Sequence, residues 1–63
     1  KGKANNFLTP IFLKKAGTAA EMGENYKAAL KIYKRLKSDF PNSNESENIE
    51  AFISYCEAKI SNS

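Results

Sequence analysis

The chain has 63 residues, of which 41% are hydrophobic and 27% charged, and its net charge is +3. This length is near the lower limit for a self-sufficient core, which argues against an enclosed active site, and so mild a charge does not by itself indicate a nucleic-acid binder. With no histidine and one cysteine, an internal disulfide, the common Cys/His zinc sites and a Ser-His-Asp or Cys-His catalytic set are excluded.

The purely apolar runs are at most three residues long, so no membrane span or signal-peptide core is predicted in this chain. Whether the parent protein carries a targeting or membrane segment upstream is left undecided by this sequence. The compartment, cytoplasmic or cell envelope, is therefore undecided too.

The polar start of residues 1–8 predicts a tail or the end of a connection. Thr9 as N-cap and Pro10 at the first helical position predict a helix over residues 10–22, ending at a left-handed Gly23. One face of this helix is rich in alanine, which predicts close approach of a second helix. That face consists of Phe12, Leu13, Ala16, Ala19 and Ala20, with Gly17 at its edge.

A second helix is predicted over residues 25–39, with Asn25 as its N-cap and Pro41 ending it. Its apolar residues recur at helical spacing on a wide arc, which indicates a middle layer packed against more than one neighbour. Ala29 and Leu30 are both expected to be deeply buried. The arc consists of Tyr26, Ala29, Leu30, Ile32, Tyr33, Leu36 and Phe40.

A third helix is predicted over residues 45–60, after a polar break in which Asn44 and Glu47 fit a capping box and Ser43 is a competing cap. Its apolar stripe is narrow, so it is expected to pack on one side only, as a lid. The stripe consists of Ile49, Phe52, Ile53, Cys56 and Ile60. The chain is therefore predicted to be all-α: an antiparallel helical hairpin at 9–41 and a capping helix at 42–63.

Several of these residues, taken together, resemble the tetratricopeptide repeat family. They are the small Ala16, Gly23 at the turn, Tyr26, Ala29, Tyr33 and the terminal Phe40-Pro41. The resemblance implies a fragment of an α-solenoid, built from hairpins of about 34 residues. It further implies the C-terminal repeat and capping helix of a longer, bacterial protein. The expected function is a non-catalytic scaffold for protein–protein interaction.

In the resembling family, ligands usually lie along a groove lined by the first helices. The partner-binding residues expected from the resemblance are Leu13, Lys14, Gly17, Ala20 and Glu21. Members that clamp the C-terminal carboxylate of chaperones carry Lys and Asn where this chain has Leu13 and Gly17. A generic protein or peptide partner is therefore expected.

Other residues offer alternatives to the scaffold. The basic side chains of the second helix, between Lys27 and Lys37, suggest a small module binding nucleic acid or anions, although a solvated surface also explains them and no nucleic acid is expected. The carboxylates of Glu45, Glu47 and Glu50 suit a helix N-terminus, and Cys56 suits a buried apolar position. No catalytic residue, metal site or cofactor is predicted, and the chain is not expected to be an enzyme.

The remaining apolar side of the first helix is predicted to support self-association. This side is expected to contain Phe7, Leu8, Ile11 and Met22. A homodimer of the chain is the expected result.

Overall fold

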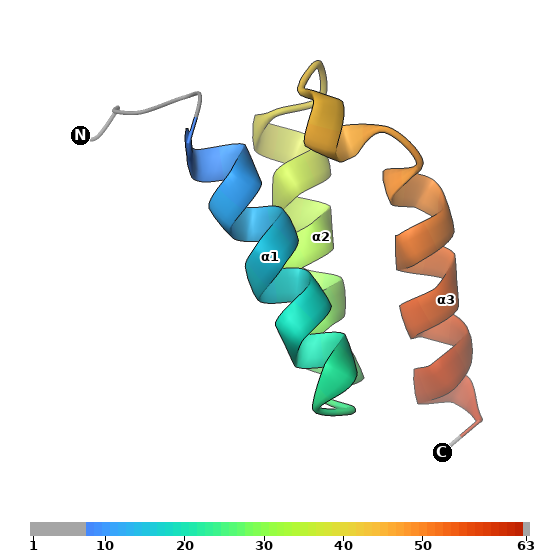
Figure 1. Cartoon of the computed structure of the whole chain (residues 1–63). Helices are drawn as coiled ribbons and strands as arrows, with labels where there is room; N and C mark the ends of the chain where they lie inside the picture. The colour runs from blue at the N-terminus through green and yellow to red at the C-terminus, as the bar shows by residue number, and fades with distance from the viewer. Residues whose placement is uncertain (1–7, 63) are drawn as a thin grey trace.

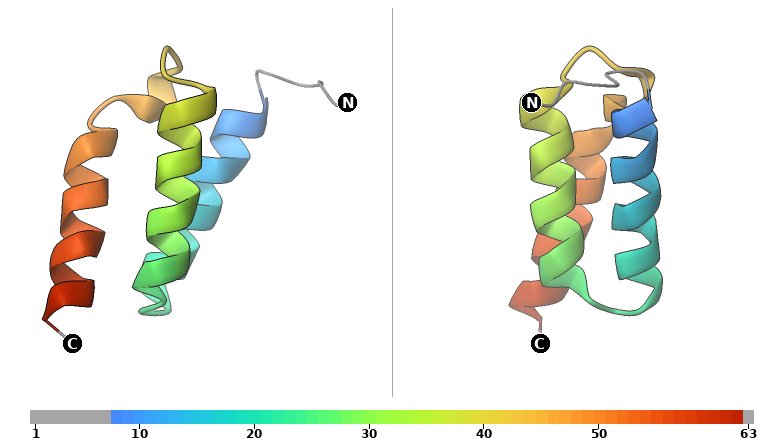
Figure 2. Two further views of the ribbon diagram at one scale, coloured as in Figure 1. Left: turned by 180° about the vertical axis from the view of Figure 1, so that it is seen from behind. Right: turned by 90° about the vertical axis from the view of Figure 1, so that its left-hand side faces the viewer.

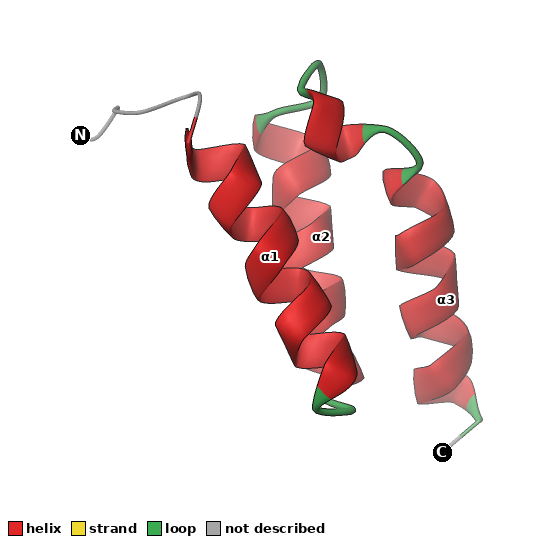
Figure 3. Ribbon diagram, viewed as in Figure 1, coloured by secondary structure: helices red, strands yellow, loops and turns green. Residues whose placement is uncertain are grey.

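Helix α2 (Tyr26–Asp39) packs against both other long helices, α1 (Leu8–Met22) and α3 (Ile49–Ser61). The computed structural model describes residues 8–62, and for Leu8 the backbone alone. Within these residues the fold is all-α, with one short 3₁₀ helix, η1 (Asn44–Ser46), between α2 and α3 (Figures 1 and 3). Successive helices run in opposite directions, as both views in Figure 2 show. The predicted hairpin and third helix are confirmed; Phe7 and the rest of residues 1–7 lie outside the described part.

The core is formed where α2 meets α3. Its fully or almost fully buried members are Ala29, Tyr33, Leu36, Ile49, Ile53 and Cys56. Tyr26, Leu30, Phe40 and Phe52 are partly buried and pack against this cluster. Most residues of the apolar arcs predicted for the second and third helices therefore form the core or pack against it, whereas the partly buried Ile32 and Ile60 lie outside this cluster. Leu30 is less buried than expected, since it lies at the edge of the cluster.

The face of α1 that packs on α2 differs from the predicted one. Gly17 is buried on the α2 side, and Leu13 and Ala20 pack against the core, whereas Ala16 and Ala19 are exposed. Phe12 is 62% exposed. The prediction of an alanine seam was wrong because Gly17, with no side chain, lets the ring of Tyr33 lie directly against the α1 backbone.

The connection between α1 and α2 is a Schellman turn. Asn25 N–H donates to the carbonyl of Ala20 at 2.8 Å, and Glu24 N–H donates to that of Glu21 at 2.8 Å. These two bonds satisfy the last carbonyls of α1. The left-handed residue is Glu24, with φ 63°, so the prediction that Gly23 has this conformation was wrong. Asn25 caps α2 as predicted, accepting from Ala28 N–H at 3.4 Å.

The helix starts differ from prediction at two places. Helix α1 begins at Leu8 rather than with Thr9 as its cap, because a proline anywhere in the first turn is tolerated. Helix α3 begins at Ile49, four residues later than expected, after a left-handed Asn48. The Ser46 hydroxyl donates to the carbonyl of Phe40 at 2.6 Å, which holds η1 against the end of α2. Asn44 and Glu47 belong to η1 and its C-cap, and Asn48 is the residue before α3, so the predicted capping box was wrong.

The geometry of the turn predicts that substitutions at the adjacent residues Gly23 and Glu24 change the stability of the fold in opposite directions. We expect Gly23→Ala to stabilise the fold by about 0.4–1 kcal/mol, because its Cβ makes only ordinary contacts and the unfolded chain loses freedom. Glu24→Val should destabilise it, since a β-branched residue is strained in the left-handed region. Urea unfolding of both variants tests this. A loss of stability in Gly23→Ala would mean that Gly23 supplies the left-handed turn.

The contact between Gly17 and Tyr33 gives a second prediction. A Cβ at Gly17 would lie 2.5 Å from Cε1 of the buried Tyr33 ring. We expect Gly17→Ala to cost about 1–2 kcal/mol, since overpacking outweighs the better helix propensity of alanine.

The matched control is Ala16→Gly at the exposed neighbouring position, where the propensity term alone should cost about 1 kcal/mol. Thermal unfolding of the two variants compares them directly. Stabilisation by Gly17→Ala would contradict the close approach of the helices.

Candidate interaction face

Tyr33 joins all three long helices. Its hydroxyl donates to Oε2 of Glu21 at 2.6 Å and lies 3.4 Å from Oγ1 of Thr18, both on α1. Its ring packs on the ring of Phe52 from α3, with 5.4 Å between centroids. A buried phenol needs a hydrogen-bond partner, and Glu21 provides it. Glu21, which was predicted as a groove residue, therefore holds the phenol of a core side chain.

The other predicted groove residues lie on the same side of α1. Leu13 and Ala20 pack against the core, and Gly17 is buried beneath Tyr33. Lys14 extends toward α3, with its Nζ 4.3 Å from the centroid of the Phe52 ring. The structure thus brings the predicted residues together along the α2-facing side of α1. Their partner binding stays a prediction.

A surface of lysines and aromatic rings extends from Lys14 across α3, and we call it the aromatic–lysine face. Tyr26 and Tyr55 meet edge to face, with centroids 6.0 Å apart. The Nζ of Lys59 lies 5.4 Å from the Tyr55 centroid and 5.9 Å from that of Tyr26. Lysine over an aromatic ring gains from the negative face of the ring. The face consists of Lys14, Tyr26, Phe52, Tyr55 and Lys59.

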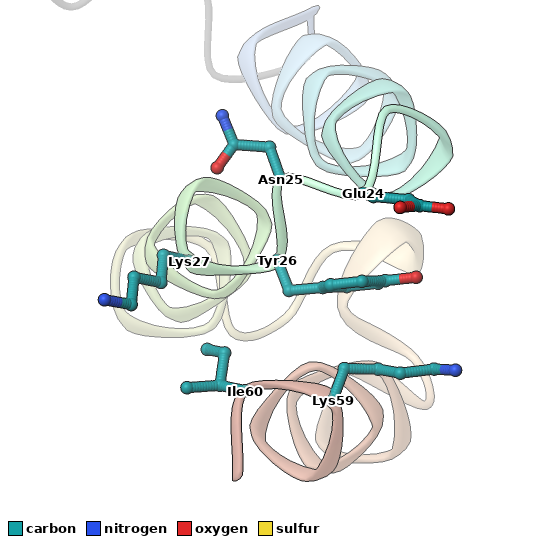
Figure 4. Close-up of a pocket in the computed structure, with 6 residues that line it drawn as sticks. All are labelled: Glu24, Asn25, Tyr26, Lys27, Lys59 and Ile60. Atoms are coloured by element: carbon teal, nitrogen blue, oxygen red, sulfur yellow. The ribbon is translucent and has the colours of Figure 1, made fainter. Parts of the chain in front are cut away.

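One end of this face borders a hollow of about 360 Å³ between the first turn of α2 and the last turn of α3. In Figure 4, Glu24, Tyr26 and Lys59 extend to one side, and Asn25 and Lys27 to the other. Side chains of both charge signs line the hollow. This mixture suits a polar peptide better than a single anion, because the glutamate would repel an anion.

Burial, with the neighbouring Tyr55 phenol adding to it, raises the pKa of Tyr26. A tyrosine with its ordinary pKa near 10 is already neutral at physiological pH, and so is Tyr26. It presents a ring and a hydroxyl beside Lys59, so it can pack against an apolar group and form a hydrogen bond.

The basic side chains of α2 are partly neutralised. Lys34 lies 4.0 Å from Glu57, Arg35 lies 3.4 Å from Asp39, and Lys37 pairs with Glu50. Two of these acidic partners come from α3, which sequence periodicity along α2 cannot show. The positive charge available for phosphates is thus lower than the sequence suggests.

Cys56 is fully buried in the core, and burial raises the pKa of its thiol. A buried thiol with a raised pKa is a packing residue, as predicted. Among residues 8–62, no group of acidic or cysteine side chains is arranged to hold a metal ion. None of the helices in this range is long and apolar enough to cross a membrane.

The residues predicted for self-association are only partly described. Met22 is 80% exposed, and Ile11 is partly buried. Phe7 and the side chain of Leu8 lie outside the described structure. Phe12, which was expected in the core, is exposed on this helix as well.

Tyr55 and Lys59 were missed as site residues by sequence reasoning. Their spacing of four places them on one ridge of α3, and this was the available signal. Their contact with Tyr26 depends on how α3 packs on α2, which the spacing alone does not give.

Comparison with known proteins matched no family model, no curated protein and no solved structure to this chain.

The buried phenol of Tyr33 leads to the prediction that the fold loses stability at high pH. Burial, and the hydrogen bond to Glu21, raise the pKa of Tyr33 to about 12. The unfolded chain loses this proton near pH 10, at about the ordinary tyrosine pKa. The stabilisation is therefore complete below about pH 10 and is lost as pH rises through about 12.

Urea unfolding at a series of pH values measures this change. Tyr33→Phe is the control, because the other tyrosines and the lysines titrate in both proteins. The difference in unfolding free energy between wild type and Tyr33→Phe should shrink above about pH 10. A constant difference would contradict the assigned environment of the phenol.

Proposed function

We propose that the chain is the terminal repeat and cap of a tetratricopeptide array and serves as a non-catalytic scaffold that binds a protein or peptide. The observation that supports this most directly is the burial of Ala29 and Tyr33, both 0% exposed, between α1 and α3. These are residues on which the sequence resemblance rests. Stacking of successive antiparallel helices around such positions is how helical repeats bury a continuous core.

The aromatic–lysine face is the proposed binding surface. Tyr55 is 46% exposed, and its ring and that of Tyr26 offer apolar area with polar edges. Aromatic residues are enriched at protein interfaces for this reason. Lys14 and Lys59 at the two ends favour a peptide that carries carboxylates. The ion pairs on α2 make nucleic acid the weaker candidate.

Peptide selection tests this proposal. Peptides selected from a random library against the chain should bind in solution, and amide shifts in NMR should cluster around Tyr26, Tyr55 and Lys59. We expect Lys59→Glu to weaken these peptides about tenfold, equivalent to about 1.4 kcal/mol.

Lys31→Glu is the matched control, because it makes the same charge change on the exposed side of α2. It should change affinity less than about twofold, as surface changes away from a contact do. Failure to select any peptide, or equal weakening by both substitutions, would count against the proposed function.

A further inference from the structure

Two lysines of the aromatic–lysine face are held by aromatic rings rather than by carboxylates. The ammonium of Lys14 lies 4.3 Å from the centroid of the Phe52 ring, and that of Lys59 lies 5.4 Å from the centroid of Tyr55. No carboxylate of residues 8–62 forms an ion pair with either lysine, whereas the paired basic side chains of α2 each have an acidic partner. The fold therefore holds two positive charges in place without neutralising them.

The two charges lie along one stripe of α3. Phe52, Tyr55 and Lys59 fall within about 60° of the helix circumference. Phe52 and Lys59 are separated by about 10 Å along the helix axis. Tyr55, which is 46% exposed, lies between them, and its ring meets that of Tyr26 edge to face. The face therefore presents a positive charge, exposed aromatic area and a second positive charge in a row.

We propose that this row binds an extended peptide segment in which an aromatic residue stands two places from an acidic residue on either side. This inference rests on the proposed peptide-binding function. In an extended chain, residues i, i+2 and i+4 point to the same side, and the outer two are about 13 Å apart. Two lysines rooted about 10 Å apart reach this span, because their stems are flexible. The aromatic residue of the peptide then lies against Tyr55 and Tyr26, where contact between rings is favourable.

The charges around Tyr26 support this order of residues. The carboxylates of Glu21 and Glu24 act on the phenol of Tyr26, so negative charge is already present at the centre of the face. Glu24 also extends to the same side as Tyr26 and Lys59 (Figure 4). An acidic residue of the peptide is therefore repelled at the central position and favoured at the two lysines.

Preorganisation makes the two lysines suitable for recognising carboxylates. A lysine that is already held over a ring loses less side-chain freedom on binding than a freely moving one. Its ammonium keeps N–H donors for a carboxylate, and a hydrogen bond between charged groups is stronger than a neutral one.

Titration of synthetic peptides into the whole chain, followed by amide shifts in NMR, tests the spacing. The matched peptide is Gly-Glu-Ser-Phe-Ser-Glu-Gly with both termini blocked. The control, Gly-Glu-Ser-Phe-Glu-Ser-Gly, has the same composition, but its second acid points to the other side. We expect the control to bind about fivefold more weakly, as the loss of one exposed ion pair predicts. Equal affinities overturn the proposal, and so does equal binding of a peptide with glutamine in place of both acids.

A pair of variants tests the role of Lys14. Lys14→Met keeps an apolar stem over the Phe52 ring and removes the charge, so the helices should be retained, which circular dichroism checks. Lys15→Met makes the same change at the exposed neighbouring position. We expect Lys14→Met to weaken the matched peptide about fivefold and Lys15→Met to change its affinity less than about twofold. Equal weakening by both variants overturns the assignment of Lys14.

Charge exchange tests direct pairing at Lys59. Lys59→Glu should weaken the matched peptide, and replacing one of the two peptide acids by lysine should restore binding. The acid whose replacement restores binding identifies the direction of the peptide, and no restoration by either peptide overturns the pairing.

The outcomes separate this inference from the proposed function. If library-selected peptides bind at the face and the matched peptide does not, the inference alone fails. If no peptide binds, the proposed function fails with it.

Discussion

The packing of the Tyr33 ring on the bare backbone of Gly17 is the contact on which the rest of the fold depends. The ring fills the space that a side chain on α1 would occupy, so the two helices approach closely. The same side chain reaches Glu21 with its hydroxyl and Phe52 with its ring. A polar group is thereby buried at the centre of the molecule with its hydrogen bond satisfied. Helix α3 is positioned partly by the same residue that pairs α1 with α2.

The apolar faces of α1 and α2 explain why the chain turns between them. Gly17 and Tyr33 are 16 residues apart, so a continuous helix would place them about 160° apart on its surface. In one straight helix the two residues would lie on nearly opposite sides and could not contact each other. The Schellman turn reverses the chain and brings the two faces together. Its left-handed Glu24 costs about 1–2 kcal/mol, which the packing around Tyr33 offsets.

The sequence predicts those helices correctly that carry a strong local signal. Pro41 and Asn25 mark the limits of α2, and large apolar residues define one face each on α2 and α3. On α1 the small residues carry no such signal, because alanine suits both core and surface. The packing role of Gly17 comes from Tyr33, far away in sequence, and the late start of α3 comes from Ser46 bonding back to Phe40. Lys14 and Glu21 were expected near a binding surface, but the contact of Tyr55 and Lys59 with Tyr26 required the placement of α3.

The surfaces of α1 and α3 that face away from α2 differ in their composition. Helix α3 buries one stripe, and most of its remaining residues are polar, so it closes its side of the molecule. Helix α1 buries Gly17 and partly buries Leu13 and Ala20, yet it leaves Phe12 and Met22 exposed on the opposite side. A helix that is apolar on two sides is an inner layer that needs a second neighbour. In the proposed repeat array that neighbour would be a preceding hairpin. The asymmetry lies between the side that α3 closes and the side of α1 that stays apolar and exposed.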